Sequence, residues 1–253
     1  MSPLPTPAYG GGRASRFGVA ALRFGVAVLL ALGLAGCSLR PAPAPVPAGG
    51  AAPWQIPTAA YGSQRLFRIS YSGPEGEGSF RLTLRLPAAD RYQVTTADPV
   101  GRALWSLDVA EDQGLFLDHR NHTFCRFDGR FDISGVPLAP FPLLSLPSLL
   151  LGRLPAEPAA PPTQKGRDLH FTDGMDRRWT ATVTSGQVVA WTLWEAGEKQ
   201  PAVLWVQRDS WAILSDRAQG VQMRWKEVVR EALPGPPAPL SVPPGFAEED
   251  CRE

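Results

Sequence analysis

The sequence predicts a mainly β fold, and three observations lead to that prediction. Short segments alternate apolar with polar side chains, which is the period of a strand with one buried face. Clusters of Gly, Pro and Asp separate these segments, as turns require. The segments recur at a spacing of about 8–12 residues, and few stretches show the helical period. This combination is typical of an antiparallel sandwich or barrel.

Six strands are predicted in the first half of the chain. In residues 79–86, Phe80, Leu82 and Leu84 point to one side, while Arg and Thr residues point to the other. Turn residues at 73–76, 87–90 and 98–101 join strands, and 119–122 is a predicted hairpin tip. The same alternation predicts the other five strands at 64–71, 91–96, 103–109, 114–118 and 123–127.

An apolar segment separates these strands from the second half. Residues 133–154 are almost wholly apolar, but prolines at 137, 140 and 142 prevent a long helix. Residues 143–151 can form one or two helical turns, with Pro147 in the first turn. We expect a buried plug, a mobile lid, or a plug that moves when a ligand replaces it. Five further strands, rich in Thr, Val and Trp, are predicted at 178–184, 188–195, 202–208, 211–216 and 221–229.

The first 36 residues have the features of a bacterial lipoprotein signal peptide. A stretch with Arg13, Arg16 and Arg23 precedes an apolar run at 24–34, which is short for a membrane span. The run ends in Leu-Ala-Gly followed by Cys37, which resembles a lipobox. That resemblance implies cleavage before Cys37 and lipidation of its thiol; the alternative is an uncleaved anchor helix with an incidental cysteine. Several acyl chains would give stable anchoring.

The rest of the chain divides into a spacer, one domain and a tail. Residues 37–60 are rich in Pro, Ala and Gly, which predicts an extended, semi-rigid tether. Residues 61–232 are long enough for one β domain, and 233–253 form a Pro-rich tail with Phe246 as an apolar anchor. With 25 basic and 24 acidic residues the formal charge is +1, which argues against a nucleic-acid partner.

No pattern of residues predicts an enzyme or a cofactor site. No nucleophile elbow, P-loop or dinucleotide fingerprint is present. His119, His122 and Cys125 can be read as part of a zinc site, but a hairpin tip explains them as well and no second ligand pair exists, so no metal is predicted. His170 is expected to be structural. In an oxidising compartment Cys125 and Cys251 can form a disulfide; the alternative is two free thiols.

The order of several motifs resembles the LolA/LolB family, over about residues 64–230. The motifs are Asp90-Arg91-Tyr92 leading to the turn at 98–101, then Gly-Val-Pro-Leu at 135–138 and Leu-Leu-Leu-Gly-Arg-Leu-Pro at 149–155. The resemblance implies an incomplete antiparallel β-barrel, wrapped around a hydrophobic cavity and covered by a short, proline-broken helical lid.

The same resemblance implies a function at the outer membrane. Ser38 after the lipidated cysteine resembles the outer-membrane sorting signal, with the protein on the periplasmic face. A LolB-like receptor accepts lipoproteins from a periplasmic LolA-like carrier, as a monomer without cofactor. A loop with an exposed apolar residue helps insertion, and Pro99, Val100 and Gly101 match it here. The alternative for Val100 is a plain turn residue.

Lipid binding also follows from the amphipathic strands, because a sheet with one apolar face must bury it. An acyl chain entering a dry space on that face gains about 0.8 kcal/mol per CH₂. The alternative for each lining residue is ordinary core, and the alternative for the protein is a structural or assembly lipoprotein that docks an envelope partner. The candidate cavity and lid residues are Phe80, Leu82, Leu84, Tyr92, Val94, Trp105, Leu107, Leu143, Leu146, Leu150, Trp191 and Leu193.

Overall fold

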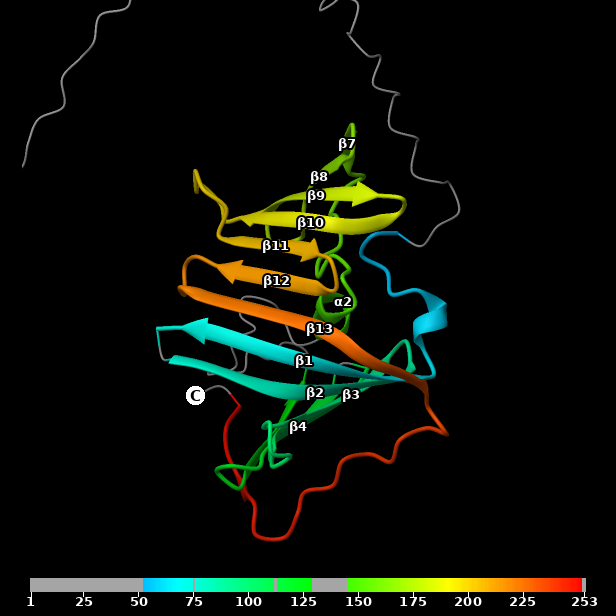
Figure 1. Ribbon diagram of the computed structural model, residues 1–253, viewed down its shortest axis with the longest axis vertical. Coiled ribbons are helices and arrows are strands. Elements are labelled where there is room, and N and C mark those ends of the chain that lie inside the picture. The colour runs from blue at the N-terminus through cyan, green and yellow to red at the C-terminus, as the bar shows by residue number, and fades with distance from the viewer. Residues whose placement is uncertain (1–51, 75, 112, 129–144, 252–253) are drawn as a thin grey trace, which may run out of the picture. The chain divides into compact units, whose positions relative to one another are not determined.

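The computed structural model describes residues 52–74, 76–111, 113–128 and 145–251, which form one large β-sheet (Figure 1). The leader at 1–36, Cys37, most of the tether, residues 135–138 and Leu143 lie outside the described residues. Within the described part of the chain, no helix is long and apolar enough to cross a membrane.

The sheet has fourteen strands, and the two described helical turns are short. The helical elements are η1 (Thr58–Ala60) and α2 (Leu146–Leu150). The strands are β1 (Ser63–Gly73), β2 (Gly76–Ala88), β3 (Arg91–Ala97), β4 (Ala103–Ala110), β5 (Gln113–Asp118), β6 (Thr123–Asp128), β7 (Thr163–Lys165), β8 (Asp168–Thr172), β9 (Arg178–Thr184), β10 (Gln187–Trp194), β11 (Val203–Arg208), β12 (Trp211–Asp216), β13 (Val221–Ala232) and β14 (Ala247–Glu248).

The strand order shows that the sheet is open. It runs β14-β6-β5-β4-β3-β2-β1-β13-β12-β11-β10-β9-β8-β7, so the two halves of the chain meet where β1 pairs with β13. Every pair is antiparallel except β14 with β6. The end strands β14 and β7 have a neighbour on one side only, so the sheet does not close. The predicted incomplete antiparallel barrel is therefore confirmed.

All eleven predicted strands are present, with ends shifted by at most a few residues. Alternation located them because one face of the sheet is mostly apolar. The turn predicted at 87–90 is shorter than expected, because β2 continues through Pro87 to Ala88, where the pairing with β3 shifts register. Such irregular positions accept a proline that cannot donate a ladder bond.

The folded part begins earlier than the predicted tether boundary at residue 60. Trp54 and Ile56 pack against the core and Ala60 is buried in it. The apolar side chains at these positions explain the difference, since a hydrated spacer would leave them in water. The main-chain N–H of Leu154 also donates to the carbonyl of Pro53, which ties this segment to the chain after α2.

The Pro-rich tail packs against the sheet. The side-chain amide of Gln93 donates to the carbonyl of Ala238 at 2.7 Å, and the N–H of Leu240 donates to Asp108 at 2.9 Å. Further on, β14 pairs with β6, and Cys251 is joined to Cys125 by a disulfide with a Cα–Cα distance of 5.4 Å. The tail is thus part of the sheet, which no alternating pattern in this short segment indicated.

Candidate functional site

One face of the sheet is largely apolar from β4 to β8, and we call it the inner face. Opposed residues of antiparallel strands share a face, so the register places Val94 opposite Leu84, and Phe67 opposite Leu82, on one face. The same face continues through Trp225 and Leu214 on the other half of the sheet. These side chains are buried. The inner face is therefore a largely apolar surface that spans both halves of the chain.

Aromatic rings dominate the second half of the inner face. The rings of Phe171 and Trp179 are stacked with centroids 5.9 Å apart, Trp179 and Trp191 lie 5.3 Å apart, and Trp191 and Trp205 are stacked at 6.1 Å. Trp54 from the N-terminal segment adds a contact with Phe171 at 6.4 Å. The N–H of Trp205 is buried without a hydrogen-bond partner among the described residues. A buried N–H group without a partner costs stability, so the packing of the inner face leaves this polar group unsatisfied.

Helix α2 covers the inner face. Leu146, Leu149 and Leu150 are buried against it. Few polar contacts hold the helix: the indole N–H of Trp225 donates to the carbonyl of Leu150 at 3.4 Å, and the hydroxyl of Ser145 donates to the carbonyl of Pro155 at 2.9 Å. The helix has five residues and no side-chain N-cap. Packing, rather than helix formation, therefore keeps it in place.

The structure brings the predicted cavity residues together on the inner face. The side chain of Trp105 is only partly buried there, in contact with Phe116 at 6.0 Å between ring centroids. Leu143 lies outside the described residues. The residues that are buried on the inner face or on α2 are Phe80, Leu82, Leu84, Tyr92, Val94, Leu107, Leu146, Leu150, Trp191 and Leu193.

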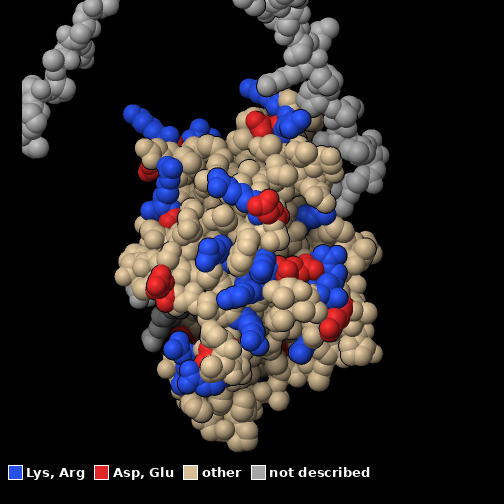
Figure 2. Space-filling view, in the orientation of Figure 1, with Lys and Arg blue, Asp and Glu red and all other residues tan. Residues whose placement is uncertain are grey.

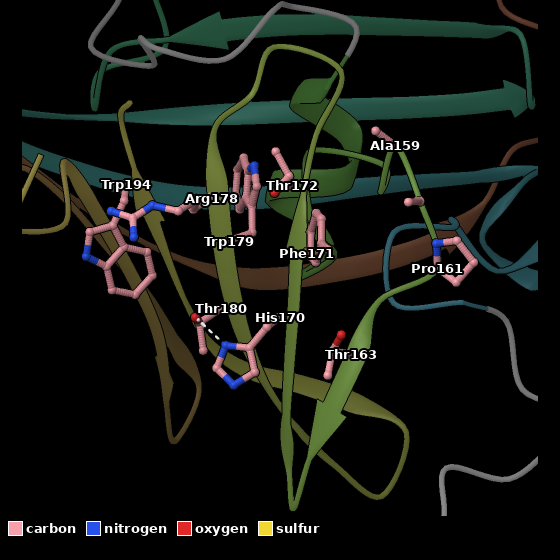
Figure 3. Close-up of a pocket in the computed structure, with 11 residues that line it drawn as sticks. Ala159, Pro161, Thr163, His170, Phe171, Thr172, Arg178, Trp179, Thr180 and Trp194 are labelled. Atoms are coloured by element: carbon pink, nitrogen blue, oxygen red, sulfur yellow. Dashed lines mark hydrogen bonds between the residues drawn. The ribbon is translucent and has the colours of Figure 1, made fainter. Parts of the chain in front are cut away.

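Helix α2 packs on part of the inner face among these residues. Two hollows of about 480 and 400 Å³ lie elsewhere. The larger lies beside β7, β8 and β9, where His170 and Thr180 contact each other at 3.0 Å (Figure 3). His170 is thus held by a threonine. The smaller is lined by residues of β1, β2 and β13, among them Glu77 and Arg224.

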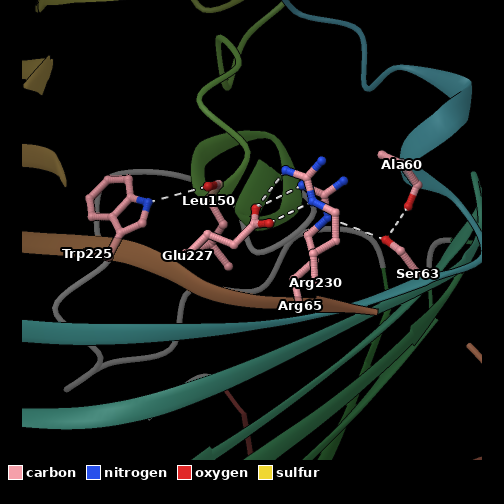
Figure 4. Close-up of polar contacts among 7 residues, drawn as sticks. All are labelled: Ala60, Ser63, Arg65, Leu150, Trp225, Glu227 and Arg230. Carbon is pink, nitrogen blue, oxygen red and sulfur yellow. Dashed lines mark hydrogen bonds and ion pairs between the residues drawn. The ribbon is translucent and has the colours of Figure 1, made fainter. Parts of the chain in front are cut away.

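An ionic cluster interrupts the inner face close to α2 (Figure 4). Arg65 donates to Glu227 at 3.0 Å, and Arg230 donates to the same carboxylate at 2.7 and 3.2 Å. Burial lowers the pKa of Arg65. Burial alone would raise the pKa of Glu227, but the hydrogen bond from Arg230 and the charge of Arg65 outweigh it, so this pKa is lowered. The sequence already indicated that Arg65 lies on this face, because it is two residues before Phe67 in an alternating strand.

The loop at 98–102 displays Val100. Asp98 accepts hydrogen bonds from the N–H groups of Val100 and Arg102 at 3.0 and 2.9 Å, and from the Arg102 side chain at 2.6 Å. The side chain of Val100 is 78% exposed, and Arg81 donates to the carbonyl of Pro99 at 3.4 Å. A braced loop thus holds one apolar side chain in water, and two arginines bond to the same loop.

The outer face over β1, β2 and β13 is basic (Figure 2). The register puts Arg68 directly opposite Arg81 on one side and Lys226 on the other. Lys226 and Arg224 lie over the ring of Trp211 at 5.0 and 5.4 Å. Among the described residues, Arg68, Arg81 and Lys226 have no ion-pair partner. Like charges in opposed positions cost stability.

The hairpin tip at 119–122 has a structural explanation. Cys125 is in the disulfide, so its sulfur is not a free ligand. His119 contacts the hydroxyl of Ser106 at 2.8 Å, and burial lowers its pKa. The rings of His119 and His122 both pack edge-on against Phe246 of the tail, at 5.8 and 5.4 Å.

These features define an open antiparallel β-sheet protein with an apolar inner face capped by a short helix. No family model matches the chain, and no curated protein matches it. Among solved structures, it is similar to a LolA superfamily protein from Nitrosomonas europaea, with 7% identity, a TM-score of 0.45, and coverage of 74% of this chain and 90% of the other. It is also similar to a DUF1329 family protein from Desulfovibrio piger, with 8% identity, a TM-score of 0.48, and coverage of 69% and 87%. At these values neither likeness decides what this chain binds.

Proposed function

We propose that the chain is a non-enzymatic, LolB-like lipoprotein of the outer membrane that binds acyl chains on the inner face and inserts lipoproteins or lipids. The observation that carries this proposal is the apolar inner face covered by a five-residue helix with few polar contacts. Such a helix can be replaced by another apolar group at little cost in hydrogen bonds. Residues 133–154, of which α2 is part, then act as the lid.

An exchange of this kind favours transfer over storage. An acyl chain gains about 0.8 kcal/mol for each CH₂ that it buries. The leucines of α2 lose a similar gain when they leave the inner face, since Leu146, Leu149 and Leu150 are buried there. The net free energy of exchanging α2 for an acyl chain is therefore small compared with the gain from burying either one. A small net affinity lets the protein release its cargo.

The other parts of the proposal concern the membrane. The leader at 1–36 is cleaved, Cys37 is lipidated, and the monomer hangs on its tether at the periplasmic face of the outer membrane. A LolA-like carrier delivers the cargo. Val100, with Pro99 and Gly101, inserts into the bilayer; its exposure on a braced loop supports this role. The arginines at 81 and 102 suit lipid phosphates, since arginine binds phosphate with several donors.

The buried tryptophans give a direct test. The mature chain, which lacks residues 1–36, carries Cys37→Ala and is titrated with a fatty acid that has a doxyl quencher on its acyl chain. Because Trp179, Trp191 and Trp205 lie together on the inner face, we expect saturable quenching of tryptophan fluorescence. An unlabelled fatty acid should reverse it. Quenching that never saturates would contradict acyl-chain binding on this face.

One observation favours the alternative of a docking lipoprotein: α2 already packs on the inner face. In that case the helix is permanent core and the outer surface carries the function. The titration separates the two, because a permanently capped face gives no saturable quenching. Native mass spectrometry of the mature chain after incubation with a lipoprotein then shows whether acylated cargo is taken up.

A further inference from the structure

A second loop is built like the loop that displays Val100. In residues 173–177, Asp173 accepts hydrogen bonds from the N–H groups of Met175 and Arg177 at 2.9 and 3.1 Å, and from the Arg177 side chain at 2.9 Å. The N–H of Asp173 donates to the carbonyl of Arg177, as the N–H of Asp98 does to that of Arg102. The same contacts thus recur in two loops with the pattern Asp, any residue, apolar residue, any residue, Arg.

Each loop displays the apolar residue at its centre. The side chain of Val100 is 78% exposed and that of Met175 is 58% exposed. The next residue has a positive φ in both loops, with 94° at Gly101 and 60° at Asp176. The two turns are therefore of the same kind, and both push one large apolar side chain into water.

The strand order places both loops at the same edge of the sheet. Strands alternate in direction from β4 to β8, so β3 and β8 run parallel to β1. The loop at 98–102 follows β3, and the loop at 173–177 follows β8. Both loops therefore lie at the edge of the sheet that is formed by the C-terminal ends of β1, β10 and β12, which Figure 1 shows as their arrowheads. Eight strand spacings of about 4.8 Å put them at most about 38 Å apart along the sheet.

We propose that Met175 is a second membrane-inserting tip, which works with Val100 so that the bilayer meets this edge of the sheet at two points. The inference rests on the proposed function, because that function brings Val100 to a membrane. A bilayer is the fitting partner, since it accepts isolated apolar tips. A protein partner needs a contiguous patch of roughly 800 Å² instead.

The hydrogen bonding within each loop supports insertion. Backbone N–H groups are costly to bury in lipid without a partner. Here the N–H groups of Val100 and Met175 are already bonded to Asp98 and Asp173. The two arginines of the loops offset the charges of these carboxylates. The tips can therefore leave water with few polar groups to satisfy.

The two tips differ in charge. Arg102 is 81% exposed and can meet lipid phosphates, whereas Arg177 is only 12% exposed and lies over the ring of Trp179 at 5.8 Å. Asp176 stands beside Met175, where the first loop has Gly101. We therefore expect the Val100 tip to prefer anionic lipid and the Met175 tip to prefer zwitterionic lipid.

The tether is long enough for this orientation. β1 starts at the opposite edge, and its 11 residues rise about 36 Å. A chain of about 14 residues, the length of 38–51, can reach at most about 48 Å. The segment 38–51 can thus span more than the length of β1.

Single reporter cysteines test the inference in the full mature chain. Because Cys125 and Cys251 are joined, and Cys37 carries the proposed lipid, a new cysteine is the one thiol that labels. Val100→Cys, Met175→Cys and the control Val228→Cys, exposed on β13, receive an environment-sensitive dye. The chains are placed in phosphatidylcholine vesicles with or without doxyl-labelled lipid. We expect the dye at 100 and at 175 to be quenched by the doxyl lipid, and the dye at 228 to stay in water.

Each outcome has a distinct meaning. Quenching at 100 but not at 175 overturns the second tip and leaves the proposed function standing. Quenching at neither position overturns the inference together with the membrane part of the proposed function. Equal quenching at 228 means that the chain lies on the vesicle without orientation, which also overturns the inference.

Partitioning of the chain with Cys37→Ala, which lacks the lipid anchor, gives a second measurement. Met175→Ser should lower its partitioning onto phosphatidylcholine vesicles about threefold to tenfold, while Val228→Ser should leave it unchanged. Asp176→Gly fits the positive φ and should raise partitioning onto vesicles containing phosphatidylglycerol about fivefold. No change with Met175→Ser would overturn the inference even if the reporter at 175 were quenched.

Discussion

Leu149→Ala should weaken the closed state of α2 and thereby strengthen acyl-chain binding. Leu149 is 1% exposed on the covered inner face. Replacing such a buried leucine by alanine costs about 2–5 kcal/mol. If α2 must leave before an acyl chain enters, a loss of about 2 kcal/mol raises the open population roughly 30-fold. The apparent affinity rises by the same factor while the open state is a minority.

The assay is the doxyl fatty acid titration of the full chain with Cys37→Ala, with and without Leu149→Ala, alongside urea denaturation. A smaller side chain also makes room on the inner face, so a second variant is needed. Ser145→Ala removes the hydrogen bond to the carbonyl of Pro155 and leaves the apolar surface unchanged. It should strengthen binding about fivefold, for a loss of about 1 kcal/mol. If both variants lower the urea midpoint and neither changes the affinity, α2 is permanent core and the lid is refuted.

Three further predictions concern stability. Cys251→Ser opens a disulfide across 126 residues and should lower the free energy of unfolding by about 2–5 kcal/mol, measured by urea denaturation against the oxidised chain. Asp173→Asn should destabilise by about 2–3 kcal/mol near neutral pH, because it leaves the covered Arg177 without its partner. The folded pKa of Asp173 is lowered despite burial, by hydrogen bonds from Trp179 and the loop, so this loss should shrink as the pH falls below about 4 and through that pKa. Arg68→Glu should raise the thermal midpoint by about 1–4 °C, because it replaces a repulsion with Lys226 by an attraction.

The β-sheet could be predicted because a period of two is a strong signal when most residues on one face are apolar. The shortest strands gave no such signal. β7 has three residues, all exposed, and β14 has two. The segment around His170 is strand-like in sequence, but β8 buries only Leu169 and Phe171. Two apolar positions are too few to establish alternation, so these strands are set by their neighbours and not by their own sequence.

The sequence predicted which residues form the apolar surface of the candidate site, but not whether a cavity lies over that surface. Alternation identifies which residues share a face, and residues such as Leu84 and Trp191 do lie on one. It cannot tell a face packed by its own chain from one that is left open, because both need the same apolar residues. Pro147 in the first turn of α2 was predictable, since proline suits that position. Whether the helix stays there depends on small differences between large packing terms, which no residue pattern contains.

The polar residues of the inner face show a different limit. Arg65 has the parity of Phe67 and Ile69, so strict alternation already placed a charge on the apolar face. Glu227 shares the parity of Trp225, and the bulge in the pairing of β1 with β13 then turns Arg230 to the same side. The cluster thus follows from register, which is a property of two distant strands. Only the pairing of the two halves of the chain brings the three side chains together.

The two tip loops extend this argument, because their pattern is written in the sequence but its meaning is not. Asp and Arg four residues apart occur at 98 and 102 and again at 173 and 177. The pattern is short, and turn chemistry alone explains an Asp at each first position. The geometry is what indicates a shared role for the two loops. They have the same set of hydrogen bonds, an exposed apolar residue at the centre, and one shared edge of the sheet. A contact that needs two loops separated by six strands can be recognised only after the strand order is known.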